Sequence, residues 1–201
     1  MSSHLIHQLY AGIAPWAALS LLLLGRNPYL SRQRIIGSLL LAFFALRIQV
    51  EIGGVNYWSL FAWCRTLEMN PSFTLTGLLV IALWQRLSGS KIFRSEDWRV
   101  TWIFGTVASL ALYPMGLGLT SIDPYAWGWE RSLPVAVAFV AALLLLAGNR
   151  CGILLLLPLG GFLLHLQESS NFWDALIDPF YGIASLVACL WILLSRLRER
   201  R

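Results

Sequence analysis

Long apolar runs separated by short basic segments are the feature of this sequence that most restricts its fold. A transmembrane helix needs about 20 predominantly apolar residues, with a tolerated range of roughly 17 to 25. Seven runs approach this length, and we expect each to span a membrane. The expected spans are 9–25, 35–54, 71–87, 100–119, 133–148, 151–168 and 179–197. Only Asn149 and Arg150 separate the fifth span from the sixth, which predicts a tight helical hairpin.

The composition supports a lipid environment. Charged residues make up 12% of the chain, whereas a soluble domain has about a quarter. So few charges leave too little polar surface for a water-soluble globule. The ten tryptophans are typical of aromatic belts at the membrane boundary. We therefore expect residues 1–201 to form a single transmembrane domain, an all-α, multi-pass helix bundle.

The basic residues predict the orientation of this bundle, because Lys and Arg collect in cytoplasmic loops. With seven spans, the N-terminus lies outside, the C-terminus is cytoplasmic, and only Arg47, Arg65 and Arg131 fall toward the outer side. An even number of spans would place one basic cluster on the wrong side. The residues expected in the cytoplasm are Arg26, Arg32, Arg34, Arg86, Lys91, Arg94, Arg99, Arg150, Arg196, Arg198, Arg200 and Arg201.

The same bias accounts for the net charge of +5 without a nucleic-acid partner. No stripe of basic residues alternates with aromatic residues as in a nucleic-acid site. The three cysteines, Cys64, Cys151 and Cys189, lack metal-ligand spacing. A single His-x-x-Glu is weak evidence for a metal. We expect neither a metal nor another cofactor.

Ionisable residues inside two expected spans predict a polar pocket that opens outward. Arg47 and Glu51 are four residues apart and His165 and Glu168 are three apart, so each pair shares a helical face. At 1.5 Å per residue, Arg47 and His165 lie roughly 18 and 21 Å from the cytoplasmic ends of their helices. Ionisable groups at such depths usually face the bundle interior. The residues expected near the mouth of the pocket are Gln49, Arg65, Glu68 and Gln167.

Two functions and one structural role are open for this pocket. In an enzyme, His165 or Glu168 acts as a general acid or base while Arg47 holds an anionic headgroup. In a transporter, Arg47 and the carboxylates bind or relay an anion or a proton. Alternatively, Arg47 and Glu51 form an intrahelical pair that snorkels outward, and His165 and Glu168 mark the wet end of a helix.

Two outer segments are rich in aromatic residues. In the loop 121–132, Trp127 and Trp129 beside Asp123 are candidates for docking a lipid-linked saccharide, or they belong to the aromatic belt. The segment 168–179 predicts a short amphipathic helix. We expect Ser169 or Ser170 to open this helix, and its apolar side to lie on the membrane. The apolar side consists of Phe172, Trp173, Leu176 and Ile177.

Capping patterns account for several of the polar residues. Asp178 before Pro179 and Asn70 before Pro71 place a capping residue ahead of a proline at the first helical position. Asp174 is then left as a candidate binding residue. Ser95, followed by Glu96 and Asp97, predicts the start of the fourth helix.

The segment 55–64, which follows Gly53-Gly54, is too short to cross the membrane. It is expected to lie flat in the outer interface as an amphipathic helix, or to dip into the membrane and return.

No catalytic motif is present in the chain. We therefore expect a small multi-pass protein of a bacterial inner membrane, serving as an accessory or assembly subunit of a cell-envelope process. It would handle a lipid-linked or anionic substrate at the outer leaflet, beside a larger membrane-protein partner. The alternatives are an intramembrane enzyme that uses His165, Glu168, Glu51 and Arg47, and a minimal ion or metabolite transporter.

Overall fold

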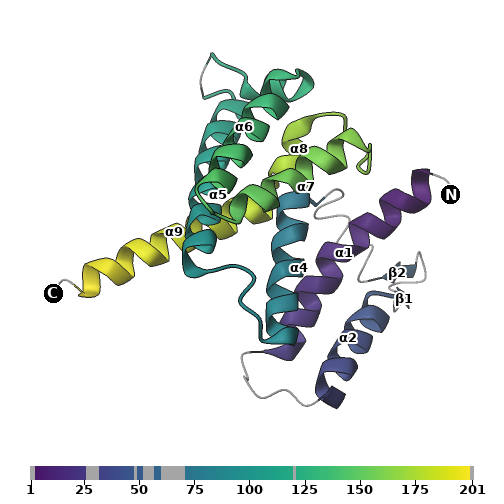
Figure 1. The fold of residues 1–201 in the computed structure, drawn as a ribbon. Helices are drawn as coiled ribbons and strands as arrows, with labels where there is room; N and C mark the ends of the chain where they lie inside the picture. Colours follow the sequence, from purple (N-terminus) through teal and green to yellow (C-terminus); the bar gives the residue numbers. More distant parts are fainter. Residues whose placement is uncertain are drawn as a thin grey trace. The chain divides into compact units, whose positions relative to one another are not determined.

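The computed structural model describes residues 3–25, 32–47, 49–51, 57–59, 71–119 and 121–199. This part of the chain contains nine helices and a two-stranded sheet (Figure 1). The helices are α1 (Ser3–Leu24), α2 (Arg32–Arg47), α4 (Phe73–Ser88), α5 (Ser95–Gly116), the 3-10 helix η1 (Pro124–Trp129), α6 (Ser132–Leu146), α7 (Cys151–Leu163), α8 (Phe172–Leu176) and α9 (Pro179–Glu199). The strands are β1 (Gln49–Glu51) and β2 (Tyr57–Ser59).

The chain divides into two compact units. The first consists of Met1–Pro71 and Leu78–Ile92, and the second of Ser72–Gly77 and Phe93–Arg201. Helix α4 belongs to both, because its first turn is part of the second unit and the remainder is part of the first.

In the first unit, α1 and α2 pack against each other, and α1 also shares a core with the later part of α4. In this core, Ala17, Leu24 and Leu83 are almost completely buried. The Arg86 guanidinium of α4 donates hydrogen bonds of 3.0 and 3.2 Å to the carbonyl of Gly25, where α1 ends. A basic side chain in this position satisfies a carbonyl that the helix itself leaves without a partner.

The second expected span, 35–54, divides into a helix and a strand. Helix α2 ends at Arg47, and β1 pairs antiparallel with β2. The flat helix expected over 55–64 is therefore wrong at residues 57–59, and the rest of that segment lies outside the described residues. Aromatic and β-branched side chains favour an extended backbone, and the paired strands contain several. The pairs are Gln49 with Ser59, Val50 with Trp58 and Glu51 with Tyr57.

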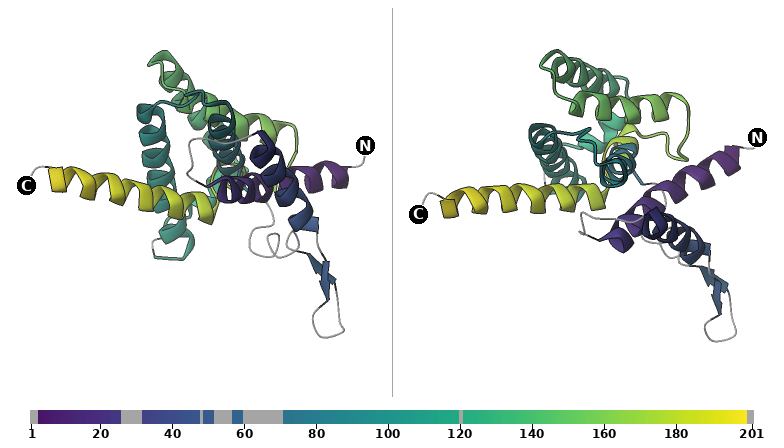
Figure 2. Two further views of the ribbon diagram at one scale, coloured as in Figure 1. Left: turned by 90° about the horizontal axis from the view of Figure 1, so that it is seen from below. Right: turned by 60° about the horizontal axis from the view of Figure 1, so that its bottom comes forward.

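Two helix pairs form most of the second unit. Helix α5 packs against α9, with Gly105 facing Ser185 and Ser109 facing Gly182. Residues later in α5 therefore face residues earlier in α9, so the two helices are antiparallel. Helices α6 and α7 lie side by side, and the tight hairpin predicted between the fifth and sixth runs is confirmed (Figures 1 and 2).

The expected seven-span, multi-pass bundle is wrong. Within the described residues, α9 is the one helix that is both long and apolar enough to cross a membrane. Each expected span contains a helix, but most of these helices are shorter than the apolar run. Helices α6 and α7 have 15 and 13 residues, or roughly 22 and 20 Å, against a hydrocarbon core of about 30 Å.

The short helices nevertheless expose much apolar surface. In α6, the side chains of Val135, Phe139 and Leu146 are 66%, 64% and 86% exposed. Large apolar side chains on a protein surface attract notice when they form contiguous patches, which soluble monomers rarely expose.

Candidate functional site

The two residue pairs of the predicted pocket do not share helical faces. Helix α2 ends at Arg47, whereas Glu51 is the last residue of β1. Helix α7 ends at Leu163, so His165 and Glu168 follow it in a loop, and both are exposed. Arg47 and Glu51 belong to the first unit, and His165 and Glu168 to the second. The helical geometry behind the predicted pocket is therefore wrong. Arg65 and Glu68, expected at its mouth, lie outside the described residues.

His165 ends the helix instead of extending it. Its φ is +51°, in the left-handed region, and Gly118 and Gly148 occupy the equivalent position after α5 and α6. The N–H groups of His165 and Leu166 donate hydrogen bonds of 3.1 and 3.0 Å to carbonyls in the last turn of α7. This is the Schellman arrangement, which usually has glycine at this position. A histidine there gives no sequence signal for a helix end, so the apolar run looked longer than the helix.

The two aromatic outer segments do meet, and we call residues 123–130 and 169–177 together the η1–α8 corner. The carboxylate of Asp174 accepts hydrogen bonds from the Tyr125 hydroxyl, at 3.1 and 3.3 Å, and from the Ser169 hydroxyl, at 2.5 Å. Burial and then the Asp174 charge raise the pKa of Tyr125 to about 12, so the phenol keeps its proton. Asp174, predicted as a binding residue, therefore joins the two segments.

Asn171 is the centre of this corner and is completely buried. Its amide donates to the carbonyl of Tyr125 at 3.1 Å and accepts from the N–H of Trp173 at 2.9 Å, which caps α8. The Trp173 indole donates to the carbonyl of Pro124 at 2.7 Å. A methyl group on Gly128 would overlap Asn171, so the segments approach more closely than any other residue allows.

The short helix predicted in this segment is confirmed as α8, but two details differ. Its capping residue is Asn171, not Ser169 or Ser170. Its apolar side faces the interior of the unit instead of a membrane, because α7 and η1 pack against it. The buried side chains are Phe172, Trp173, Leu176 and Ile177.

The outer surface of the corner exposes two indole rings, of which that of Trp129 also makes a T-shaped contact with the Tyr125 ring at a centroid distance of 6.4 Å. Trp127 and Trp129 are 47% and 59% exposed. Asp123 accepts from the N–H of Tyr125 at 3.0 Å and caps η1, while Glu130 accepts from the Ser132 hydroxyl at 3.1 Å. This surface therefore combines flat aromatic groups with two solvent-facing carboxylates.

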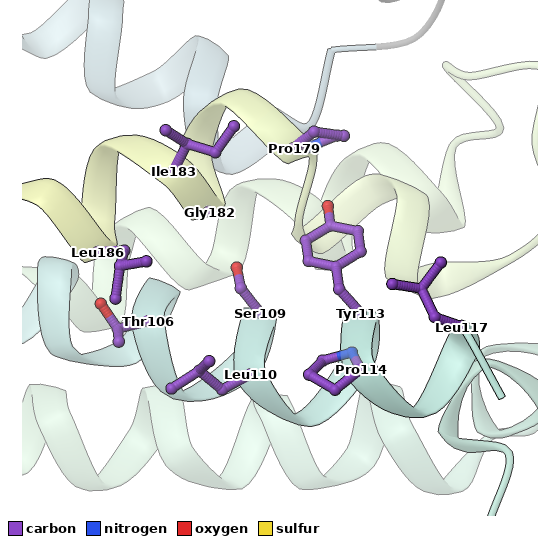
Figure 3. A pocket seen from close by; sticks show the side chains of 10 residues that line it. All are labelled: Thr106, Ser109, Leu110, Tyr113, Pro114, Leu117, Pro179, Gly182, Ile183 and Leu186. Carbon is purple, nitrogen blue, oxygen red and sulfur yellow. The ribbon is translucent and has the colours of Figure 1, made fainter. Parts of the chain in front are cut away.

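An apolar groove of about 400 Å³ runs between α5 and α9 (Figure 3). Its lining ends with Leu117 after α5 and Pro179 at the start of α9, and η1 packs against α5. One end of the groove therefore lies next to the η1–α8 corner. We call it the α5–α9 groove. It is lined by Thr106, Ser109, Leu110, Tyr113, Pro114, Leu117, Pro179, Gly182, Ile183 and Leu186.

Small residues make this groove possible, and sequence reasoning missed them. Gly105 and Ser109 lie one turn apart on α5, and Gly182 and Ser185 lie close together on α9. Small residues at this spacing are the usual sign of close helix packing in membranes. That pattern was the available signal for the α5–α9 pair.

Asp178 joins the start of α9 to the start of α4. Its carboxylate accepts from the N–H of Tyr181 at 2.8 Å and from the N–H of Ser72 at 2.9 Å. The predicted role of Asp178 as a cap is therefore confirmed. Helix α4 begins at Phe73 with Ser72 as its capping residue, so Pro71 is not its first residue; Asn70 lies outside the described residues.

Asp97 holds the opposite end of α5. The carboxylate accepts from the N–H of Arg94 at 2.8 Å and from the N–H of Arg150 at 2.9 Å, and it pairs with the Arg94 guanidinium at 3.3 Å. The same guanidinium donates to the carbonyl of Gly148 at 2.6 Å. Burial disfavours the charged form of Asp97, but these hydrogen bonds outweigh it and lower its pKa. The predicted start of α5 at Ser95 is confirmed.

Within the described residues, no group of three or more His, Cys, Asp or Glu side chains is placed to hold a metal ion. The features with the geometry of a site are the α5–α9 groove and the η1–α8 corner. No protein-family model matches the chain, and no curated protein or solved structure is significantly similar to it.

Proposed function

We propose that this chain is a membrane-anchored accessory protein that holds the hydrocarbon part of a lipid-linked substrate. The apolar α5–α9 groove, which ends beside an aromatic and acidic corner, is the observation that carries the proposal. The hydrocarbon occupies the groove, and the polar end of the substrate lies at the corner.

Helix α9 is the proposed anchor. Its 21 residues span roughly 32 Å, about the thickness of the hydrocarbon core. Only 17% of its most apolar stretch is buried within the chain, which is unlike the core helix of a soluble protein. Arg196 and Arg198 in its last turn favour a cytoplasmic C-terminus in a bacterial inner membrane.

The lining of the groove selects its occupant. A volume of about 400 Å³ is within the range of ligand sites. The lining offers no charged side chain, so an ion or a free sugar would lose its hydration without compensation. A hydrocarbon chain has no polar group to dehydrate, and its binding buries apolar surface of both the ligand and the groove.

The corner suits a hydroxyl-bearing headgroup. Exposed indole faces such as those of Trp127 and Trp129 stack on flat, weakly polar surfaces. The carboxylates of Asp123 and Glu130 accept hydrogen bonds from hydroxyl groups. A saccharide on a lipid combines both preferences.

The test is to fill the groove with a larger side chain. Leu186 lines the groove, whereas Leu190 lies one turn further along α9, exposed and outside it. The full-length protein in mild detergent is mixed with monoglucosyl dioleoylglycerol, and retained lipid is counted by native mass spectrometry. We expect Leu186→Trp to lower retention at least tenfold and Leu190→Trp to leave it unchanged. Equal retention by the wild type and both variants contradicts the proposal.

A further inference from the structure

The α5–α9 groove contains one hydroxyl group whose hydrogen-bonding capacity is unused. The side chain of Ser109 is 7% exposed, and its Oγ has no hydrogen-bond partner among the described residues. Figure 3 shows Ser109 on α5, pointing toward α9 among the apolar side chains of the groove. In the described part of the chain, the hydroxyls of Ser20 and Thr74 are also buried without a partner, and Ser185 is buried beside Tyr181; none of these three residues lines the groove.

A serine inside an apolar helix usually solves this problem by bonding to a carbonyl one turn back. Examples of this bond occur elsewhere in the described part of the chain. Ser88 donates to Trp84, and Ser195 to Trp191, both at 2.8 Å; Thr101 donates to Asp97 at 2.9 Å. Ser109 has the same option and does not use it. Leaving a buried hydroxyl unpaired costs free energy, which a ligand that offers an acceptor recovers.

We infer that the substrate is an ester-linked acylglycerol lipid, whose ester carbonyl accepts a hydrogen bond from Ser109. This inference rests on the proposed function. The hydroxyl lies beside Gly182, which itself lines the groove, and staggered χ1 positions allow it to turn toward a ligand there. A hydrocarbon without an ester, such as a polyprenyl chain, has no acceptor to meet it.

The position of Ser109 along α5 fits this assignment. It lies eight residues before Leu117, roughly 12 Å from the end of the groove beside the corner. The glycerol and its headgroup occupy that distance, and the acyl chain continues past Ser109 toward Thr106 and Leu186.

The experiment compares two lipids that differ only in this carbonyl. Monoglucosyl dioleoylglycerol and its dioleyl ether analogue are titrated against the full-length protein, and dissociation constants are measured by native mass spectrometry. We expect the wild type to bind the ester roughly fivefold more tightly, as one neutral hydrogen bond implies. Ser109→Ala is expected to bind both lipids with the affinity of the ether.

Ser185→Ala is the matched control, because it removes a buried hydroxyl outside the groove. It keeps the fivefold preference if the inference is correct. Equal binding of ester and ether by the wild type overturns the inference but leaves the groove as a hydrocarbon site. Binding of neither lipid overturns the proposed function itself. Thermal unfolding of each variant serves as the control that the fold is retained.

Discussion

His165 adopts the backbone conformation that glycines adopt after α5 and α6. A residue with a Cβ destabilises the folded state by about 1–2 kcal/mol in the left-handed region, relative to glycine. Glycine loses more conformational entropy on folding, which offsets part of this difference. His165→Gly is therefore expected to stabilise the protein by about 0.5–1 kcal/mol. Thermal unfolding monitored by circular dichroism should show a midpoint raised by about 2 °C.

Two further variants separate backbone strain from the loss of the imidazole. His165→Ala removes the ring but keeps the Cβ, so no stabilisation is expected. Gly118→Ala introduces the strain after α5 at a φ of +77°, where a methyl group would meet no atom of the described residues within 4 Å, and should lower the midpoint. If His165→Ala stabilises the protein as much as His165→Gly, the imidazole and not the backbone is the source of the strain.

The buried carboxylate of Asp97 should make the stability of the folded protein decrease in acid. Its folded pKa lies below the ordinary 3.8, so its contribution to stability is complete above about pH 4 and is lost as the pH falls through the folded pKa. Asp97→Asn leaves buried donors from Arg94 and Arg150 imperfectly paired and should cost about 1–3 kcal/mol at pH 7. The stability gap between the wild type and the variant should shrink below about pH 4, as measured by thermal unfolding between pH 7 and pH 3.

The neighbouring Glu96 is the control for this measurement, because it is exposed in the same helical turn. Glu96→Gln should follow the wild-type acid profile. A gap between wild type and Asp97→Asn that stays constant down to pH 3 would show that the Asp97 carboxylate does not carry the acid response.

At the scale of helices, close contact between α5 and α9 depends on glycine. A methyl group on Gly105 would overlap Ser185 and Tyr181, whereas one on Gly160 of α7 would meet no atom of the described residues within 4 Å. Gly105→Ala should destabilise the protein by about 1–3 kcal/mol through overpacking. Gly160→Ala should be neutral or stabilise it by up to about 1 kcal/mol, because alanine is the better helix former. Unfolding midpoints of the two variants check the contrast, and equal midpoints would contradict the observed packing.

The sequence predicted where helices form better than where they end. Every expected span contains a helix, because apolar runs of this length are helical in any environment that excludes water. Helix ends depend on single backbone conformations, and apolar composition does not report them. The turn at His165 and the strand after Arg47 shortened two expected spans in this way.

The candidate site was predictable only in part. The aromatic segments were recognised as outer loops of interest, but their association through Asn171, Tyr125 and Asp174 joins residues 46 to 49 positions apart. No local pattern encodes such a contact. The α5–α9 groove arises where two helices pass each other, and the small residues of these helices were the available signal for their close packing.

For the whole molecule, the proposed single crossing by α9 separates two chemically different ends of the second unit. The α9 start adjoins the corner with its exposed tryptophans and carboxylates, and the α9 end carries Arg196 and Arg198. Acidic and aromatic groups gather where the groove ends, while basic groups collect at the other end of α9. A substrate loaded at the corner would therefore be handled on the side away from the cytoplasm.

Cysteine labelling in intact cells tests this arrangement. In a chain whose native cysteines are replaced by alanine, Trp127→Cys should react with an impermeant maleimide added outside. Arg198→Cys should react only after the cells are opened, because the arginine end of α9 stays in the cytoplasm. Ser132→Cys, exposed beside the corner, is a second outer position that leaves the indole faces intact. Labelling of Trp127→Cys and Arg198→Cys from the same side would mean that α9 does not cross the membrane, and the proposed anchor would fall with it.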